Sequence, residues 1–294
     1  MSDKAGPSQE GQLEGNIAAH GNAVTEGITT ALSWLTVIPL RGATVFDRIT
    51  GRRAISALPI VGLVPTAAAV ALTVAFMAAG QPADDSAGIE LALLGALIVV
   101  ATQLLTRGMH LDGLADIADA LGSYAPPEKA REILRDPSTG PMGVGAIVLS
   151  QLVNAAAFAL LSAIAIGYWR SEPTFGTIST GLACFAVPFV ASRLAATTAC
   201  WTRFPRQSDT GFGGLVAGSQ PGWVIATWWL VLFFLAACSL GLAGLLASAS
   251  SLIMTLVFTR HCSHRLGGIG GDVLGAVIES STAVSSCALA IALQ

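Results

Sequence analysis

The segment GIELALLGALIVVATQLLTRGMHLDGLADIADALG, residues 88–122, joins an apolar run directly to an acidic one. Its first part, residues 88–106, matches the about 20 predominantly apolar residues that a membrane-spanning helix needs. Three aspartates, Asp112, Asp116 and Asp119, follow shortly after. Acidic side chains are costly near lipid and usually carry a function there. The segment therefore predicts a membrane-spanning helix followed by a polar helix with a chemical role.

The composition of the whole chain supports a membrane protein. Of 294 residues, 53% are hydrophobic and only 11% are charged, whereas a soluble domain has about 25% charged residues. The net charge of −3 gives no sign of a nucleic-acid partner. The five cysteines include no CxxC pair, so we expect neither disulfides nor a zinc site but small apolar side chains in the packing.

The remaining apolar stretches extend this prediction to an all-α, polytopic integral membrane bundle. They are residues 54–80, 142–168, 176–200, 222–259 and 273–294. Residues 222–259 are too long for one span and predict a hairpin that turns near SLGLAG, which brings the expected number of transmembrane helices to about seven. The segment 28–40 is too short to cross and predicts an interfacial or re-entrant helix.

The loops predict the orientation. Four basic loops alternate with two connections, GQPADDSAGIE and GYWRSEPTFG, that are poor in basic residues. Because basic loops remain cytoplasmic, we expect the four basic loops to face the cytoplasm. The polar first 25 residues predict a disordered cytoplasmic tail, 1–25, ahead of a transmembrane catalytic domain, 26–294.

The spacing of the aspartates indicates a metal site. On a helix, Asp112, Asp116 and Asp119 share one face, where they repel one another. A divalent cation removes this repulsion, and carboxylate oxygens suit Mg²⁺. Gly113 beside them permits close approach of a ligand. The alternative is a solvated helix whose acids pair with the basic residues Lys129, Arg131 and Arg135.

The stretch REILRDPSTGPMGVGA, residues 131–146, adds groups that bind anions. We expect Arg135 and the backbone amides near Gly140 and Gly143 to contact phosphate, although an ordinary turn has the same composition. Metal-bound acids with arginines are what phosphoryl transfer requires. His110 is the candidate general base, with Asp136 as its competitor; a lone histidine is more often structural.

Other polar residues are expected to converge on the same pocket. Arg193 lies inside an apolar span, where a cation usually faces the bundle interior or a polar cavity. Asp272 begins the last span, where it could instead favour the helix dipole, and Glu279, deeper in the membrane, should be buried against protein. The further residues predicted to bind substrate are Arg52, Arg53, Arg107, Arg203, Arg206 and Arg265.

The motif MHLDGLADIADALG resembles the signature of the cobalamin synthase family, the adenosylcobinamide-GDP ribazoletransferases. The resemblance includes LTVIP, LPIVG, RDPSTGPMGV, SRLAA, GFGGLVAGS and HRLGGIGGDVLGAVIE, in this order along the membrane region. Ile117, Ala120 and Gly270 depart from residues common in the family. Ala120 follows Asp119 directly and could alter the turn after that acid.

The resemblance implies a Mg²⁺-dependent enzyme of the bacterial inner membrane. Its substrates would be adenosylcobinamide-GDP and α-ribazole or α-ribazole 5′-phosphate, with the 5′-hydroxyl of α-ribazole attacking phosphorus and GMP leaving. Asp112, Asp116 and Asp119 would hold Mg²⁺, and arginines would bind the phosphates. The lipid bilayer is the other expected partner, and a homo-oligomer is left open.

Two rival functions fit parts of the pattern. A CDP-alcohol phosphotransferase also uses an acidic helix with a DG pair, but it requires Ala-Arg soon afterwards, where this chain has Ala115-Asp116. An ion-coupled transporter could use the carboxylates as a cation site, but its acids should lie near mid-membrane. Residues 107–141 instead form a polar connection between spans.

Overall fold

The computed structural model describes residues 15–80, 87–172 and 174–294. This part of the chain is helical, and its only β-pairings are two isolated bridges. The elements are η1 Ile17–Ala19, α2 Ala23–Leu35, α3 Arg48–Ser56, α4 Leu58–Val61, α5 Leu63–Ala78, α6 Ala87–Leu105, α7 Met109–Gly122, α8 Pro127–Ile133, α9 Pro141–Arg170, α10 Phe175–Ala199, α11 Gly211–Val216, α12 Gly222–Leu266 and α13 Gly271–Ala292.

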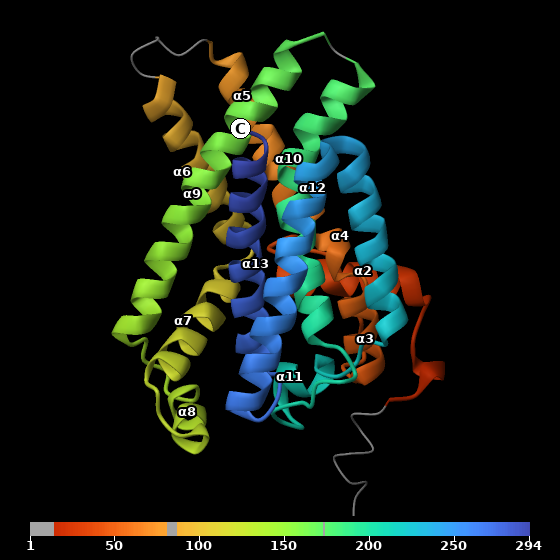
Figure 1. Ribbon diagram of the computed structural model, residues 1–294. Helices are drawn as coiled ribbons and strands as arrows, with labels where there is room; N and C mark the ends of the chain where they lie inside the picture. The colour runs from red at the N-terminus through yellow and green to blue at the C-terminus, as the bar shows by residue number, and fades with distance from the viewer. Residues whose placement is uncertain (1–14, 81–86, 173) are drawn as a thin grey trace, which may run out of the picture.

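Six helical stretches of the described residues are long and apolar enough to cross a membrane, and α12, with 45 residues, is long enough to cross twice. Its helix breaks at Gly241, where φ is 56° and ψ is −136°. Residues eight apart in a continuous helix are separated by about 12 Å, yet a Cβ on Gly244 would lie 2.5 Å from the Ala236 carbonyl oxygen. The chain therefore turns back here, as Figure 1 shows, and the predicted hairpin and seven crossings are confirmed.

The expected span 54–80 is not one helix. The chain bends at Ala57 and Gly62, between α3, α4 and α5. Gly62 packs so closely on α10 that a Cβ there would lie 2.7 Å from the Phe189 carbonyl oxygen. These interruptions allow close contact between the short helices and α10.

The N-terminal part folds against the bundle before residue 26. Residues 1–14 of the expected tail lie outside the described residues. His20 contacts both Glu26 and Asp47, each at 2.9 Å, and hydrogen bonding to Asp47 raises the pKa of the imidazole. Helix α2 has 13 residues and is about 20 Å long, too short to cross a bilayer, as expected for the segment 28–40.

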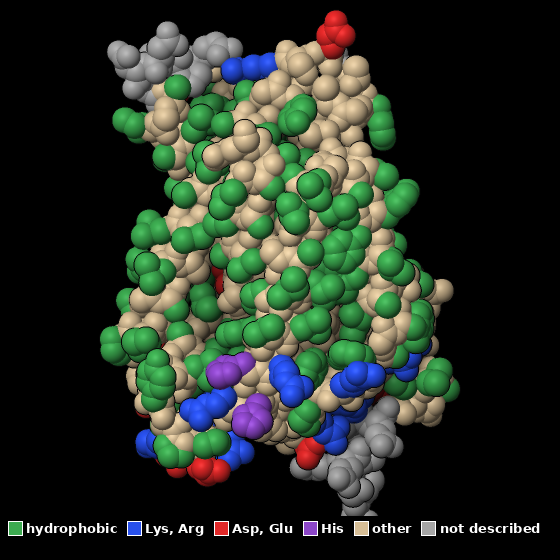
Figure 2. All heavy atoms as spheres, in the orientation of Figure 1, with side chains coloured by type: hydrophobic (Ala, Val, Ile, Leu, Met, Phe, Trp, Pro, Cys, Tyr) green, Lys and Arg blue, Asp and Glu red, His purple; other side chains and the backbone are tan. Residues whose placement is uncertain are grey.

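Helix α13 lies in the middle of the molecule, in contact with α7, α9, α10 and α12 (Figure 1). Charged side chains gather mainly at the end that holds α7, α8 and α11, whereas the long middle section is mostly apolar (Figure 2). This distribution is that of a multi-pass membrane protein with one polar end.

The five cysteines are all free thiols. Cys184, Cys200 and Cys262 are buried and Cys287 is half-buried, in line with the expected role as small apolar side chains. Cys238 is exposed, so for this residue the expectation of packing in the interior is wrong. It lies in the first arm of α12, shortly before the turn.

Candidate active site

Helix α7 begins where two consecutive residues adopt left-handed backbone conformations. Arg107 has φ 57° and Gly108 has φ 64°. A glycine adopts this conformation without strain, but an arginine does so only when its surroundings hold it there. This turn separates the membrane-spanning α6 from the polar α7 and sets the direction in which α7 leaves the bundle.

The acids of α7 share one face, as the spacing predicts. At about 100° per residue, Asp112, Asp116 and Asp119 fall within about 60° of one another around the helix axis. We call these three side chains the acidic face. Asp112 is exposed, and the other two are half-buried. His110 lies about 120–180° from these acids around the helix axis and is buried, so the predicted base points away from the predicted acids.

A fourth carboxylate joins the acidic face from a distant part of the sequence. Helix α13 crosses α7 where both have glycines: a Cβ on Gly113 would lie 2.7 Å from the Asp272 carbonyl oxygen, and one on Gly275 would lie 3.0 Å from the His110 carbonyl oxygen. This close crossing places Asp272, in the first turn of α13, beside the acidic face. Asp272 therefore belongs with the candidate metal-binding acids rather than with the phosphate-binding residues.

The acidic face is electrostatically unfavourable without a cation. Burial and, in decreasing order, the negative charges of Asp112, Asp272 and Asp119 together raise the pKa of Asp116 to about 6. No basic side chain contributes to this pKa. The alternative expected from the sequence is that basic residues of the same loop neutralise the acids. This alternative does not apply to Asp116, since no basic side chain influences its pKa. Lys129 instead pairs with Glu132 at 2.9 Å.

The arrangement suits a cation that the protein shares with a ligand. Among the described residues, no three His, Cys, Asp or Glu side chains are positioned to hold a metal ion by themselves. Mg²⁺ usually binds through one or two carboxylates together with substrate phosphates and waters. The acidic face supplies hard oxygen ligands for that mode, whereas the three-aspartate site predicted from the sequence is not formed.

Asp119 has a different set of partners. Its two carboxylate oxygens accept hydrogen bonds from the backbone amides of Gly140, at 2.6 Å, and Gly143, at 2.9 Å. These amides begin α9, so Asp119 fastens the start of α9 to α7. The sequence predicts that the same amides bind a phosphate; in the structure they bind this carboxylate instead.

His110 lacks the environment of a general base. It is 5% exposed, and neither ring nitrogen has a hydrogen-bond partner. Burial, together with the nearby charge of Arg193, lowers the pKa of the imidazole to about 3. A base must reach the proton it removes, and His110 faces the interior of the bundle. The base role predicted from the sequence does not fit this position.

Asp136 is also a poor base. Its carboxylate accepts hydrogen bonds from the Ser138 amide, at 2.9 Å, and the Ser138 hydroxyl, at 2.5 Å. These bonds lower the pKa of Asp136, and a lower pKa weakens a base. The carboxylate stabilises the turn before α9, which is the structural alternative for this loop.

Arg193 is buried and separate from the polar end. It is 1% exposed, and its Nη1 donates to the Ser192 hydroxyl at 2.9 Å. Its charge interacts with Glu279, which is 4% exposed and accepts hydrogen bonds from the amide groups of Gln103 and Gln151. The predicted burial of Glu279 is confirmed. Arg193 is buried apart from the exposed acids, so the structure does not support a phosphate contact, and its role in binding substrate stays a prediction.

Three of the remaining arginines are available to an anion. Arg52, Arg135 and Arg203 are exposed. The guanidinium groups of Arg52 and Arg135 make no hydrogen bond or ion pair within the described ranges. The guanidinium of Arg203 stacks on the Trp201 ring, with 4.5 Å between its Cζ atom and the ring centroid. These cations can bind phosphate oxygens without breaking an existing contact.

The other four arginines already hold parts of the chain together. Arg53 pairs with Glu26 at 3.2 Å, Arg206 pairs with Asp209, Arg265 donates to the Ala125 carbonyl at 2.7 Å, and Arg107 donates to the Trp34 carbonyl at 2.7 Å. Arg265 thereby ties the end of α12 to the loop after α7. A structural role is therefore established for each of them, beside the predicted role in binding substrate.

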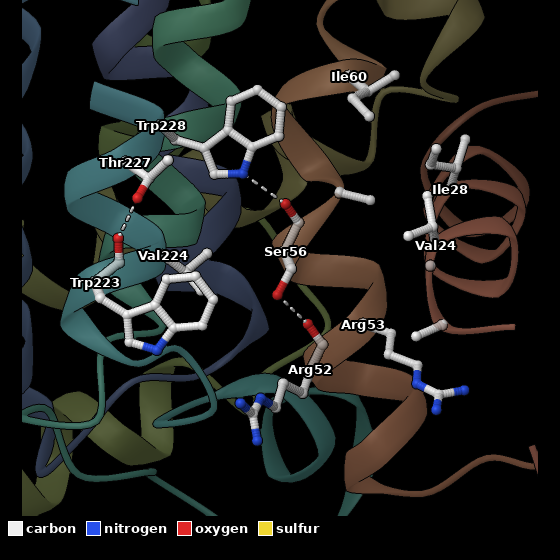
Figure 3. A pocket seen from close by; sticks show the side chains of 13 residues that line it. Val24, Ile28, Arg52, Arg53, Ser56, Ile60, Trp223, Val224, Thr227 and Trp228 are labelled. Atoms are coloured by element: carbon white, nitrogen blue, oxygen red, sulfur yellow. Dashed lines mark hydrogen bonds between the residues drawn. The ribbon is translucent and has the colours of Figure 1, made fainter. Parts of the chain in front are cut away.

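A hollow that the sequence does not reveal lies between α2, α3 and the first arm of α12 (Figure 3). Its volume is about 440 Å³. Trp223 and Trp228 lie on one side and Arg52 and Arg53 at one end, and the Trp228 indole donates to the Ser56 carbonyl at 2.9 Å. None of its lining residues comes from α7 or α13, so this hollow is separate from the acidic face.

A second hollow, of about 500 Å³, lies against the start of α7. Its walls include Trp34, Phe46, Phe212, Met109 and Arg107, and we call it the aromatic pocket. Four separate segments of the chain contribute to it: α2, the loop before α3, the start of α7, and α11. No spacing in the sequence links these segments, which is why only the folded structure reveals the pocket.

Comparison with known proteins gives consistent results. The family model described as cobalamin-5-phosphate synthase matches residues 27–290. The adenosylcobinamide-GDP ribazoletransferase of Corynebacterium efficiens is 42% identical over 286 residues, with 93% of this chain and 94% of that protein covered. The protein of that name from Corynebacterium diphtheriae is 36% identical over 285 residues, with 93% of each chain covered. The Pseudomonas aeruginosa protein is 31% identical over 267 residues, covering 90% of this chain and 96% of its own length. No solved structure matches.

Proposed function

This chain belongs to the cobalamin-5-phosphate synthase family, and on that premise we propose that its reaction takes place at the acidic face of α7. The chain is a membrane transferase of cobalamin biosynthesis. It joins α-ribazole or α-ribazole 5′-phosphate to adenosylcobinamide-GDP, giving adenosylcobalamin or its 5′-phosphate together with GMP. The rival functions, a CDP-alcohol phosphotransferase and an ion-coupled transporter, are set aside by this family membership.

The reaction replaces one bond to phosphorus with another. A ribose hydroxyl attacks the phosphorus attached to cobinamide, the bond from that phosphorus to the bridging oxygen of GMP breaks, and GMP keeps that oxygen. The name cobalamin-5-phosphate synthase describes a product in which the 5′-oxygen still carries its phosphate. With this substrate the attacking group is another ribose hydroxyl. The expectation that the 5′-hydroxyl attacks therefore does not apply to α-ribazole 5′-phosphate.

The observation that carries the proposal is the uncompensated negative charge around Asp116, whose pKa burial and three neighbouring carboxylates raise to about 6. We assign Mg²⁺ binding to Asp112 and Asp116, with Asp272 beside them, while Asp119 holds the start of α9. Bound Mg²⁺ would neutralise charge on the diphosphate. The proton of the attacking hydroxyl passes toward this carboxylate face, because His110 faces the opposite side of α7.

The diphosphate also needs fixed positive charge, for which we assign Arg135 and Arg203. Both are exposed and belong to loops at the polar end of the bundle. Arginine binds phosphate oxygens in a bidentate manner, and such charge-assisted hydrogen bonds are about twice as strong as neutral ones. We further propose that this end faces the cytoplasm of the bacterial inner membrane, since its loops carry most of the arginines and lysines.

The test measures GMP release from adenosylcobinamide-GDP and α-ribazole 5′-phosphate by the purified chain in detergent, with and without Mg²⁺. Asp112→Asn should abolish release, because it removes a proposed Mg²⁺ ligand. The fold should be retained, because Asp112 is exposed. Glu132→Gln is the matched control, because Glu132 is an exposed acid at the same end that pairs only with Lys129. Full activity in Asp112→Asn, or activity unaffected by chelation of Mg²⁺, would reject the proposed metal site.

Asp119→Asn separates the two kinds of acid. The asparagine keeps one side-chain oxygen that accepts an amide hydrogen bond, so the start of α9 stays attached and most GMP release should remain. If Asp119→Asn abolishes GMP release as Asp112→Asn does, Asp119 would instead be assigned as a metal ligand. Thermal unfolding of both variants in detergent identifies any loss that comes from the fold.

A further inference from the structure

The aromatic pocket places three rings around one hollow at the polar end of the molecule. The ring centroids of Trp34 and Phe46 are 6.0 Å apart in a stacked arrangement, and those of Trp34 and Phe212 are 5.6 Å apart in an edge-on arrangement. The volume of about 500 Å³ lies in the range of small-molecule sites. Aromatic walls of this kind suit a flat apolar ring system.

Two of the three rings are exposed. Phe46 is 62% exposed and Phe212 is 37% exposed. Packing against the rest of the chain therefore leaves a large part of both side chains free. Exposed apolar patches bordered by polar residues commonly mark ligand sites. Here the polar border is Arg107.

The aromatic pocket adjoins the acidic face on two sides. Met109, which lines the pocket, lies on the same side of α7 as Asp112 and Asp116, one turn before Asp112. From the other side, Phe212 lies over α13: a Cβ on Gly271 would be 3.8 Å from its ring, and Asp272 is the next residue. A ligand in the pocket would therefore reach toward these carboxylates.

Arg107 supplies a positive charge at the border of the pocket. Its backbone has φ 57°, a conformation that costs an L-residue free energy and is commonly retained at functional sites. Its Nη2 donates to the Trp34 carbonyl at 2.7 Å, which fixes the side chain against the aromatic wall. The guanidinium has five N–H donors, so donors remain for an anion.

We propose that the aromatic pocket binds the nucleoside substrate. This inference rests on the proposed function. The base of α-ribazole is a flat bicyclic benzimidazole, which lies against Trp34 and Phe212. The 5′-phosphate binds Arg107, and the free ribose hydroxyls point toward the acidic face. The large corrinoid then approaches from outside, with its diphosphate at the acids.

The hollow in Figure 3 is a weaker candidate for the nucleoside. It also has tryptophans and arginines, but none of its lining residues belongs to α7 or α13. A nucleoside bound there would have no contact with the helices that carry the carboxylates. The exposed Trp223 of that hollow, 68% exposed, therefore serves as a matched control for Trp34.

The experiment compares steady-state kinetics of Trp34→Ala, Phe212→Leu and Trp223→Ala with the unaltered chain. Loss of a ring that stacks on a base weakens binding about tenfold to a hundredfold. Trp34→Ala and Phe212→Leu should raise KM for α-ribazole 5′-phosphate by this factor while KM for adenosylcobinamide-GDP stays unchanged. Trp34→Phe should restore most of the affinity, and Trp223→Ala should have none of these effects.

Arg107→Gln tests the phosphate contact. It should raise KM for α-ribazole 5′-phosphate at least tenfold and leave KM for unphosphorylated α-ribazole unchanged. Equal changes for both nucleosides, or KM values unchanged in Trp34→Ala and Phe212→Leu, would overturn the pocket assignment. If the pocket assignment fails in this way while Asp112→Asn is still inactive, the proposed function is unaffected. If the unaltered chain releases no GMP, the proposed function itself is contradicted.

Discussion

Two polar clusters in this molecule differ in the signs of the charges that they bring together. Inside the bundle, Arg193 and Glu279 have opposite charges, and the amides of Gln103 and Gln151 donate to the carboxylate. At the polar end, the acidic face of α7 and Asp272 have charges of one sign. The buried cluster contains charges of both signs, and amides from two other helices hydrogen-bond its carboxylate, so it links the helices that contribute to it. The acidic face lacks such compensation, so it depends on something from outside.

The comparison teaches that the cost of a charge does not identify its role. A charged residue within the membrane is by default a functional candidate, and Arg193 meets that description. Its partners, however, all come from packed helices, and the adjacent cavity of about 10 Å³ has room for about one water. The acids outside the membrane are individually less costly, but together they create the site.

Among the variants that test this contrast, the largest effect is expected for Asp116→Asn. Loss of this carboxylate should reduce GMP release on the order of 10³-fold, since metal stabilisation of phosphate charge contributes several kcal/mol to the transition state. The same change should raise the unfolding temperature of the metal-free chain at neutral pH. The folded-state pKa of Asp116 lies above its ordinary value, which means that its negative charge destabilises the fold.

Both quantities are measured on one preparation, by GMP release and by thermal unfolding in detergent with a chelator. The combination is diagnostic, because a purely structural acid would lose stability when neutralised. A lower unfolding temperature for Asp116→Asn would show that the acidic face is compensated after all, and the contrast with the buried cluster would disappear.

Arg193→Leu should act on stability. Removing one of two opposite charges in the interior should lower the free energy of unfolding, because the other charge then remains buried without it. Arg193 is 1% exposed and Glu279 is 4% exposed. The double variant Arg193→Leu/Glu279→Leu should recover most of this loss. Denaturant unfolding in mixed micelles measures both, and equal stability of the single and double variants would show that the two charges do not depend on each other.

A third and smaller effect is the pH dependence of metal binding. Because the pKa of Asp116 is raised to about 6, protonation competes with a cation as the pH falls through 6. Mn²⁺ affinity should then fall by about tenfold per pH unit below 6 and level off above it. Titration of Mn²⁺ by electron paramagnetic resonance measures this, with Asp116→Asn as the variant that should lose the dependence. A profile unchanged in that variant would assign the proton elsewhere.

The sequence predicted local features of the fold well. The apolar runs predicted the membrane-spanning helices, and the length of residues 222–259 predicted the turn that the structure places at Gly241. Both depend on short-range properties, namely the helical rise and the backbone freedom of glycine. The same reasoning would have separated His110 from the acidic face, because spacings of two, six and nine residues on a helix place His110 well away from the three aspartates.

The features that the sequence did not predict depend on contacts between distant segments. Asp272 joins the acids only because Gly113 and Gly275 let α13 cross α7 closely. Asp119 is occupied because α9 begins directly beside it, with the Gly140 amide 2.6 Å away. The aromatic pocket depends on four segments at once. Tertiary packing determines each of these, and no periodicity in one chain contains that information.

The smallest effect is expected for His110→Leu. A leucine fills a similar volume and removes two buried nitrogens that have no hydrogen-bond partner, so the free energy of unfolding should stay the same or rise slightly. GMP release should remain within about twofold of the unaltered chain, whereas loss of a general base costs about 10²–10⁴-fold. The assay is run at several pH values, because a histidine with a pKa of about 3 is neutral throughout and contributes no change in rate near neutrality. A hundredfold loss in a variant that unfolds at the usual temperature would restore His110 to the reaction and would mean that the interior side of α7, and not only its acidic face, takes part in the chemistry.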